Sequence, residues 1–249
     1  MNIVLWGVVP YLTLALVIGG TIWRYRYDKF GWTTRSSELY ESRLLRIASP
    51  LFHYAVLGII VGHIIGLVIP ESWTEAIGVS ESLYHWGAGG LGLVAAAAAL
   101  VGVAMLIYRR RTTGPVFMAT TRNDKLMYLV LVAALVAGTY VTLVGALAPH
   151  DPGVNYRETV SPWFRSTFYF NPDINAMAAA PLGFHVHVLI GMLLFCLVPF
   201  TRLVHIFTAP LHYFFRPYIV YRSRDDLRAP GNRASRPGWT PVGVKERHR

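Results

Sequence analysis

Five long apolar runs dominate the pattern of hydrophobic and polar positions along the chain. They cover residues 3–23, 48–69, 86–107, 126–147 and 183–207, and the first four contain no Asp, Glu, Lys or Arg. A helix needs about 20 apolar residues to cross about 30 Å of hydrocarbon. A chain of this size has too little polar surface to cover five such runs in water. The pattern therefore predicts an all-α integral membrane protein with five transmembrane helices.

The first run could be read as a secretory signal peptide, but such a signal opens with basic residues. The first ten residues, MNIVLWGVVP, contain none. We therefore expect this run to remain as a membrane span, with residues 1–222 forming one transmembrane domain. Residues 223–249 are rich in Arg, Pro and Gly. We expect them to form a basic, disordered cytoplasmic tail.

The loops between the runs differ in charge, which predicts the orientation. The loops after the second and fourth runs contain only two basic residues, Arg157 and Arg165. Their acidic residues are Glu71, Glu75, Glu81, Asp151, Glu158 and Asp173. The basic segments follow the first, third and fifth runs and contain Arg24, Arg26, Lys29, Arg35, Arg43 and Arg46, then Arg109, Arg110, Arg111, Arg122 and Lys125, then Arg216 and the basic residues after it. Because cytoplasmic loops are enriched in Lys and Arg, we expect the N-terminus outside and the C-terminus in the cytoplasm.

Composition agrees with a membrane protein and limits its chemistry. Hydrophobic residues make up 54% and charged residues 14% of the chain, and the mean hydropathy is +0.41. The formal net charge of +10 could indicate a nucleic-acid partner, but its concentration on one side indicates a cytoplasmic face instead. Cys196 is the single cysteine. The chain alone therefore provides no disulfide framework, Cys-ligated zinc site or iron–sulfur cluster.

Four histidines lie within two of the predicted spans, His53 and His63 in the second and His187 and His205 in the fifth. These two spans cross the membrane in opposite directions. His63 and His187 therefore lie at a similar depth near the outer face, and His53 and His205 lie at a similar depth near the cytoplasmic face. A polar ring in hydrocarbon needs a partner. Facing imidazoles without a nearby thiolate or carboxylate suit the two axial positions of a haem iron. For any one histidine alone, the alternative is a hydrogen bond to a neighbouring helix.

The spacing of the histidines fits this pairing incompletely. The pair in the second run is 10 residues apart, about 15 Å of helix, whereas the pair in the fifth run is 18 residues apart, about 27 Å. Tilt and a kink at Pro199 could absorb part of the difference. Small residues near the histidines would leave room for a flat macrocycle or, alternatively, allow close helix packing; these are Gly58, Gly62, Gly66 and Gly191.

Four segments resemble a known family: WRYRYDKFGWTTRSS after the first run, LFHYAVLGIIVGH in the second, RRRTTGPVFMATT between the third and fourth, and HVLIGMLLFCLVPFTRLVHIF in the fifth. Over residues 5–222 the chain resembles the gamma subunit of membrane-bound respiratory nitrate reductase, a dihaem cytochrome b that anchors a cytoplasmic catalytic dimer. The resemblance implies two haem b groups, an inner one held by His53 and His205 and an outer one held by His63 and His187. Depth alone favours the same pairing.

The resemblance also implies a function and partners. The subunit would oxidise quinol near the outer face of the bacterial or archaeal cytoplasmic membrane and pass electrons through both haems to an iron–sulfur (beta) subunit. A molybdenum-containing (alpha) subunit would then reduce nitrate in respiration. The chain would thus be the electron-transfer part of a quinol:nitrate oxidoreductase. Its basic segments would contact the partner subunits, and nucleic acid would not bind.

The sequence departs from the family pattern at the quinol site. The family has a lysine just before the third span, but the segment ESWTEAIGVSESLYHWGAGG contains none. His85, Glu81 and Gly66 are the candidate quinol contacts here. Arg202, three residues before His205, is a candidate contact for a haem propionate; the alternative is an ordinary arginine at the membrane interface.

Two other functions are compatible with the sequence. Related subunits serve nitrite-oxidising enzymes and reductases of sulfur compounds or heterodisulfides, and a single chain does not separate these from nitrate reductase. A histidine-lined transporter is a different class. It would need acidic or hydroxyl partners along its route, and the second and third runs contain almost none.

Overall fold

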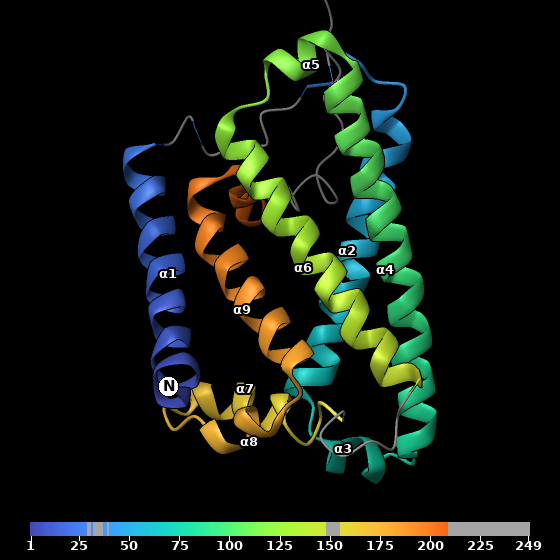
Figure 1. Cartoon of the computed structure of the whole chain (residues 1–249), viewed down its shortest axis with the longest axis vertical. Helices are drawn as coiled ribbons and strands as arrows, with labels where there is room; N and C mark the ends of the chain where they lie inside the picture. The colour runs from blue at the N-terminus through green and yellow to red at the C-terminus, as the bar shows by residue number, and fades with distance from the viewer. Residues whose placement is uncertain (29–30, 32–36, 39, 148–154, 209–249) are drawn as a thin grey trace, which may run out of the picture. The chain divides into compact units, whose positions relative to one another are not determined.

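The computed structural model describes residues 1–28, 31, 37–38, 40–147 and 155–208. Within these ranges the chain is helical without strands, and five segments are long and apolar enough to cross a membrane (Figure 1). They are Ile3–Tyr27, which contains α1 (Val9–Tyr27), then α2 (Leu45–Val68), α4 (Glu81–Thr112), α6 (Arg122–Leu147) and Leu182–Phe200, which contains α9 (Leu182–Leu197). The predicted all-α class with five spans is confirmed.

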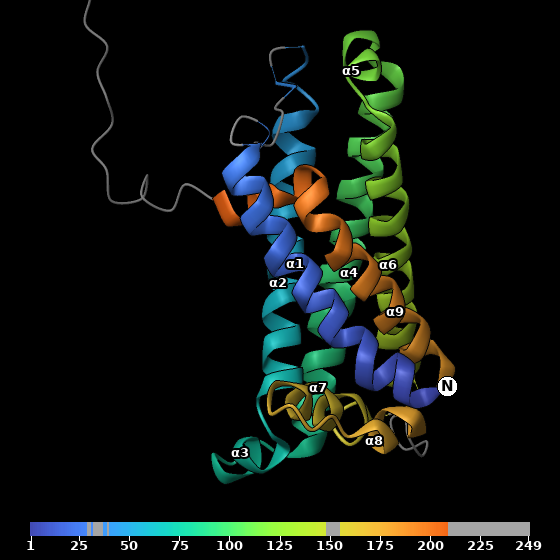
Figure 2. The same ribbon diagram turned by 90° about the vertical axis from the view of Figure 1, so that its left-hand side faces the viewer.

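The five helices pack side by side as a bundle (Figures 1 and 2). Helix α2 packs against α4, α4 against α6, α6 against α9, and α9 against α1. In the part of the chain that the structure describes, α2 and α9 are not among the helix pairs in extensive contact. The helices that carry His53, His63 and His187 are therefore not closely packed against each other.

Short helices lie at the two ends of the bundle. The N-terminus, α3 (Glu71–Ala76), α7 (Val160–Phe168) and α8 (Ile174–Ala179) lie at one end, which we call the α7 end; α5 (Gly114–Met118) lies at the other, the α5 end (Figures 1 and 2). A buried cluster at the α7 end includes Trp6, Trp163, Met177 and Phe184. The Trp163 indole N–H donates to the Trp6 carbonyl at 2.8 Å. This apolar cluster joins α7 and α8 to the ends of the first and last spans.

Helix boundaries follow local signals that the apolar runs alone do not show. Helix α4 begins at Glu81 rather than at the predicted residue 86, because the Ser80 side chain accepts a hydrogen bond from the backbone N–H of Leu83 at the helix start. The predicted fifth span, 183–207, does not continue as one helix. Pro199 has no N–H for the helical ladder, and its ring clashes with a preceding carbonyl. Helix α9 therefore ends at Leu197.

After α9 the chain follows a different path. A short 3₁₀ turn, η3 (Val198–Phe200), leads to Thr201, whose backbone is extended with φ −118° and ψ −175°. A 3₁₀ segment, η4 (Arg202–Thr208), then carries His205. The predicted basic tail, 223–249, lies outside the described residues.

Candidate functional site

The structure brings the four intramembrane histidines together as two facing pairs. The ring centroids of His53 on α2 and His205 on η4 lie 6.0 Å apart. Those of His63 on α2 and His187 on α9 lie 6.1 Å apart. The first pair is toward the α5 end and the second toward the α7 end, as their positions on the helices require. These are the partners that depth along the spans predicted.

Backbone hydrogen bonds orient three of the four rings. The Nδ1 atom of His53 lies 2.7 Å from the Ser49 carbonyl oxygen, and that of His63 lies 2.8 Å from the Ile59 carbonyl. The Nδ1 atom of His205 lies 2.5 Å from the Arg202 carbonyl. A carbonyl can only accept, so Nδ1 carries the proton in each of these rings. This leaves Nε2 with its lone pair free to bind a metal, the arrangement typical of metal-ligating histidines.

The separation of the rings fits a single metal ion between the members of each pair. Centroid separations of 6.0 and 6.1 Å leave room for one ion bound by a nitrogen of each ring at about 2.0 Å. Within the described ranges no group of three or more His, Cys, Asp or Glu side chains converges on a metal position. A metal held by only two protein ligands must bring its other ligands with it, as a haem iron does. The donor set therefore fits two haem groups.

The glycines near these rings divide into two kinds. A Cβ added at Gly62 or Gly191 would meet nothing within 4 Å, whereas one at Gly66 would lie 2.8 Å from the Tyr156 hydroxyl. Of the glycines expected to leave room for a macrocycle, Gly62 and Gly191 thus face open space and Gly66 serves close packing. Gly138 on α6, which the sequence did not single out, lies against the His187 ring, where an added Cβ would be 2.9 Å from Cε1.

The His187 ring differs from the other three rings. Its Nδ1 atom is buried without a hydrogen-bond partner among the described residues. Gly138 of α6 packs directly against this ring, so α6 helps to set its position. Only the fold could show this, because α6 is distant in sequence from the residues that flank His187.

Arg202 lies at the α5 end, where the sequence suggested a haem propionate contact. Its Nε atom donates to Asp124 Oδ1 at 2.8 Å, and Asp124 is only 4% exposed. The structure thus gives Arg202 a carboxylate partner on α6. The propionate contact stays a prediction that must compete with this ion pair.

The three candidate quinol contacts occupy the α7 end of α2 and α4. Glu81 accepts from Arg157 at 2.8 Å, and the guanidinium carbon of Arg157 lies 3.9 Å from the centre of the Tyr84 ring. The Tyr84 and Tyr156 hydroxyls are 3.0 Å apart, and Tyr156 packs on Gly66. Glu81 and Gly66 therefore belong to one partly buried network with Arg157 at its centre. Sequence reasoning treated Arg157 only as one of the few basic residues on its side.

His85, the third candidate, is placed differently from Glu81 and Gly66. Its Nε2 atom is buried and has no hydrogen-bond partner among the described residues, and its ring lies beside Trp86, with centroids 6.4 Å apart. A buried nitrogen of this kind can bond a bound molecule without giving up a protein contact.

Two ionisable groups at the α7 end have shifted pKa values. Burial, and then the hydrogen bond between the Tyr156 and Tyr84 hydroxyls, raise the pKa of Tyr156. Burial, and then the negative charge of Glu81, raise the pKa of Glu71. Both shifts favour the protonated, uncharged form.

At least one arginine of the basic segments, Arg109, stabilises the fold through contacts within the chain. Arg109, at the end of α4, is 2% exposed and donates from Nη1 to the Ser37 hydroxyl at 2.8 Å, and its Nε atom pairs with Glu41. The hydrogen bond from the Leu44 N–H, and then Arg109, lower the pKa of Glu41. Arg109 thus fixes the segment before α2. Much of the WRYRYDKFGWTTRSS segment, residues 29–30 and 32–36, lies outside the described residues.

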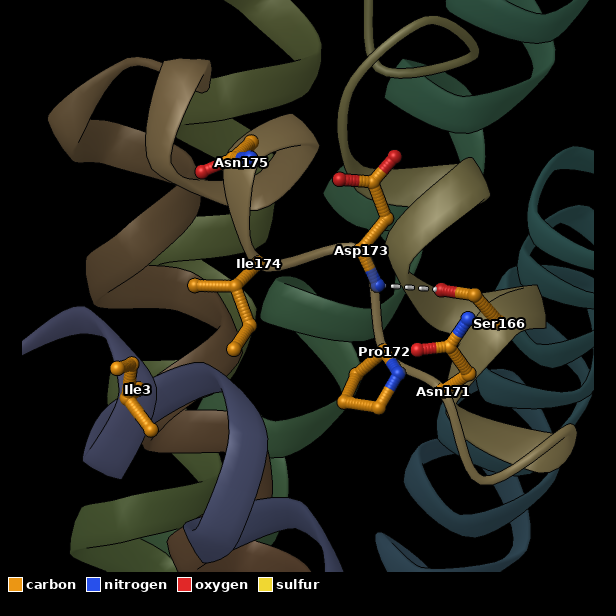
Figure 3. Close-up of a pocket in the computed structure, with 7 residues that line it drawn as sticks. All are labelled: Ile3, Ser166, Asn171, Pro172, Asp173, Ile174 and Asn175. Atoms are coloured by element: carbon orange, nitrogen blue, oxygen red, sulfur yellow. Dashed lines mark hydrogen bonds between the residues drawn. The ribbon is translucent and has the colours of Figure 1, made fainter.

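Figure 3 shows a recess at the α7 end of the bundle. It is lined by Ile3, Ser166, Asn171, Pro172, Asp173, Ile174 and Asn175. The Asp173 N–H donates to the Ser166 hydroxyl at 2.8 Å across it. None of the paired histidines or quinol candidates lines this recess, so it adds nothing to the candidate site.

A five-span helical bundle with two histidine pairs along its spans defines a class of protein, the membrane-embedded helical bundles with paired imidazoles. Comparison with known proteins gives the family. Residues 2–224 match the family model described as nitrate reductase gamma subunit. The chain therefore belongs to the nitrate reductase gamma subunit family.

Individual relatives agree with this membership. The chain is 43% identical over 221 residues to the nitrate reductase gamma chain of Bacillus subtilis, covering 89% of this chain and 98% of that one. It is 31% identical over 225 residues to the respiratory nitrate reductase 2 gamma chain of Escherichia coli, covering 90% and 98%. The family that the four sequence segments suggested is thereby confirmed.

A more similar relative is a much longer protein. The chain is 61% identical over 239 residues to the nitrate reductase-like protein NarX of Mycobacterium tuberculosis strain H37Rv. The match covers 96% of this chain but only 36% of NarX. The chain thus spans about a third of the length of this relative.

Proposed function

We propose that this chain is the dihaem cytochrome b subunit of a quinol:nitrate oxidoreductase, which takes electrons from quinol and delivers them to an iron–sulfur partner. The observation that carries the proposal is the presence of two histidine pairs with ring centroids 6.0 and 6.1 Å apart. His53 and His205 would hold the inner haem b, and His63 and His187 the outer one. When bound, each haem iron would supply reversible one-electron reduction.

The protein side chains prepare these sites. The carbonyls of Ser49, Ile59 and Arg202 hold the proton on Nδ1 of three ligands. Each of these rings then presents Nε2 as a neutral donor. The apolar spans exclude water around the ligands, because their exposed surfaces would face lipid. The chain itself has no cysteine cluster for an iron–sulfur centre, so the substrate of the complex would be reduced on another subunit.

Quinol would bind at the α7 end, which we expect at the outer face because the basic residues gather at the opposite end. Glu81, His85 and Gly66 lie at this end of α2 and α4. The Glu81 carboxylate is already paired with Arg157, whereas the buried Nε2 of His85 has no partner among the described residues. His85 is therefore the first of the three to test as a contact to a quinol oxygen.

The opposite, basic end would face the cytoplasm and the partner subunits. The B. subtilis and E. coli relatives are named as gamma chains of nitrate reductase, which supports an iron–sulfur beta subunit and a molybdenum alpha subunit as partners here. Arg110, Arg111 and Lys125 line a recess between α4, α5 and α6 at this end. They could meet a partner surface or anionic lipid in the bacterial or archaeal cytoplasmic membrane.

Haem stoichiometry in single-histidine variants tests the proposed function. The full chain is purified in mild detergent, and its haem is quantified from the reduced-minus-oxidised spectrum and the pyridine haemochrome. We expect two haem b groups in the unsubstituted chain, loss of the outer haem alone in His63→Ala and loss of the inner haem alone in His53→Ala. The physical reason is that each haem would lose one of the two histidines proposed to hold it.

His185→Ala is the matched control, because His185 lies two residues from His187 and its Nε2 atom bonds the Met177 carbonyl at 2.8 Å instead of facing another histidine. It should retain both haems. A chain without haem, or equal loss of both haems in His53→Ala and His63→Ala, would contradict the proposed function.

The terminal substrate is a separate question. A nitrite oxidoreductase or a reductase of sulfur compounds or heterodisulfides would use the same histidine pairs. Mass spectrometry of the subunits that co-purify with the chain decides between them, and we expect an iron–sulfur subunit together with a molybdenum-containing one.

A further inference from the structure

The break after α9 lies between the two histidines of the last span, and the pairing depends on it. On one continuous helix, His187 and His205 would lie about 27 Å apart, whereas His53 and His63 on α2 are separated by about 15 Å. Two straight helices with these spacings could not bring both pairs into contact. Both pairs nevertheless face each other at 6.0 and 6.1 Å. The change of direction after Leu197 makes this possible.

A helix break inside a membrane frees backbone carbonyls that must find donors. Here every carbonyl from residue 197 to 202 accepts a hydrogen bond. The Leu197 carbonyl accepts from the Thr201 hydroxyl, and the Val198 carbonyl from the Thr201 N–H. The Pro199 carbonyl accepts from Arg24, and the Phe200 carbonyl from Asn123. The Thr201 carbonyl accepts from Arg24 and the Val204 N–H, and the Arg202 carbonyl from His205. The break is therefore a built feature of the fold and not a frayed end.

Arg24 on α1 supplies the central donors. Its Nη1 atom donates to the Pro199 carbonyl at 2.6 Å and to the Thr201 carbonyl at 2.9 Å, and its Nη2 atom donates to the Gly31 carbonyl at 2.6 Å. The side chain is 5% exposed. One guanidinium thus joins both sides of the break to α1.

Gly20 lies one turn before Arg24 on the same face of α1 and lets the break approach. A Cβ at Gly20 would lie 3.0 Å from Cβ of Pro199 and 3.3 Å from Cζ of Phe200. The glycine and the arginine act together, because Arg24 can reach the carbonyls only while α1 is this close.

Helix α6 holds the other side of the break. The Asn123 amide donates to the Phe200 carbonyl at 2.6 Å. Asp124 accepts from Arg202 at 2.8 Å. Arg202 in turn presents its carbonyl to Nδ1 of His205. The contacts therefore lead from α1 and α6 through the break to the imidazole that faces His53.

We propose that Arg24, with Gly20 beside it, is a positioning residue for the inner haem: it clamps the break after α9 so that His205 faces His53. This inference rests on the proposed function, because it assigns Arg24 to one of the two haems. Arg24 itself makes no contact with the haem iron in this proposal. It acts through the backbone that carries His205.

The test compares the two haems within one sample of the full chain. We expect Arg24→Ala to weaken inner-haem binding by about tenfold or more, the lower range for removing an outer-shell partner of a metal ligand. The low-spin EPR signal of the remaining inner haem should shift, and the outer-haem signal should stay unchanged and report an intact fold. Arg24→Lys keeps the charge without the fork of donors, and should show the same selective change to a smaller degree. Gly20→Val should resemble Arg24→Ala.

Arg26→Ala is the matched control, because Arg26 is two residues away on α1 and exposed. It should leave both haem signals unchanged. An unchanged inner haem in Arg24→Ala would overturn the proposal. Equal loss of both haems in Arg24→Ala and Arg24→Lys would also overturn it, since it would show a role in overall folding. If His53→Ala fails to remove one haem, the proposed function itself fails, and this outcome is distinct from a failure of Arg24 alone.

Discussion

At the scale of single residues, each paired histidine is fixed by something other than its partner ring. A carbonyl one helical turn away fixes His53 and His63, whereas His187 lies against Gly138 of α6. An imidazole that turns freely would lose rotational entropy on binding a metal. Rings fixed in advance lose less, so these contacts favour ligand binding.

Gly138→Ala tests the role of packing at His187. The new Cβ would lie 2.9 Å from Cε1 of the ring, so the ring must move away from its position opposite His63. We expect a shifted or diminished outer-haem signal and an unchanged inner-haem signal in the low-temperature absorption and EPR spectra. Gly145→Ala, on the same helix with nothing within 4 Å of the added Cβ, should leave both signals unchanged. Identical spectra for the two variants would show that Gly138 does not position the ring.

At the scale of elements, close contact between α2 and α4 depends on a small residue. A Cβ at Gly102 of α4 would lie 2.8 Å from the backbone nitrogen of Phe52 and 2.9 Å from its Cα. Backbone atoms cannot move aside as a flexible side chain can. Helices in membranes commonly use glycine in this way to pack closely, and here the contact holds the α5 end of α2, which carries His53, against its neighbour.

Gly102→Ala should therefore destabilise the bundle by about 1–3 kcal/mol, the usual effect of adding a methyl group to a fully packed site. The measurement is the thermal unfolding midpoint of the purified chain in detergent, followed by circular dichroism. Gly90→Ala on the same helix is the control, because an added Cβ there meets nothing within 4 Å. An unfolding midpoint for Gly102→Ala equal to that of the control would mean that the helices separate at no measurable loss of stability.

At the scale of the whole molecule, charge separates the two ends of the bundle. The α7 end contains Glu71, Glu75, Glu81, Glu158 and Asp173 with Arg157 and Arg165, and the α5 end contains Arg109, Arg110, Arg111, Arg122 and Lys125. Two of these arginines also have carboxylate partners, Glu81 for Arg157 and Glu41 for Arg109. These arginines therefore contribute both to the orientation of the chain in the membrane and to the stability of its fold.

The orientation leads to a labelling prediction. In a Cys196→Ser background, Ser72→Cys in α3 should react with an impermeant maleimide added to intact cells, because the acidic end is expected outside. Thr112→Cys at the end of α4 should react only after the membrane is opened. Both positions are exposed. The reverse pattern would invert the topology and place the quinol candidates on the cytoplasmic side.

The sequence by itself determined the class, the number of spans, the family and the matching of histidines by depth. It could do so because hydrocarbon requires long apolar helices, and because a histidine within them stands out. The sequence did not determine how two histidines 18 residues apart in the last span could match two histidines 10 residues apart in the second. It suggested a kink at Pro199, and the tertiary structure shows a full break with an extended residue at Thr201.

Only the tertiary structure decided which distant side chains stabilise this arrangement. Arg24 was one basic residue among many in the sequence, and Gly138 one small residue in an apolar run. Their roles depend on which helix lies beside them, and the periodicity of a single helix does not contain that information. The physical reason is that a buried carbonyl or ring needs a partner within about 3–4 Å, and only the packing of the whole bundle brings residues so distant in sequence within that distance.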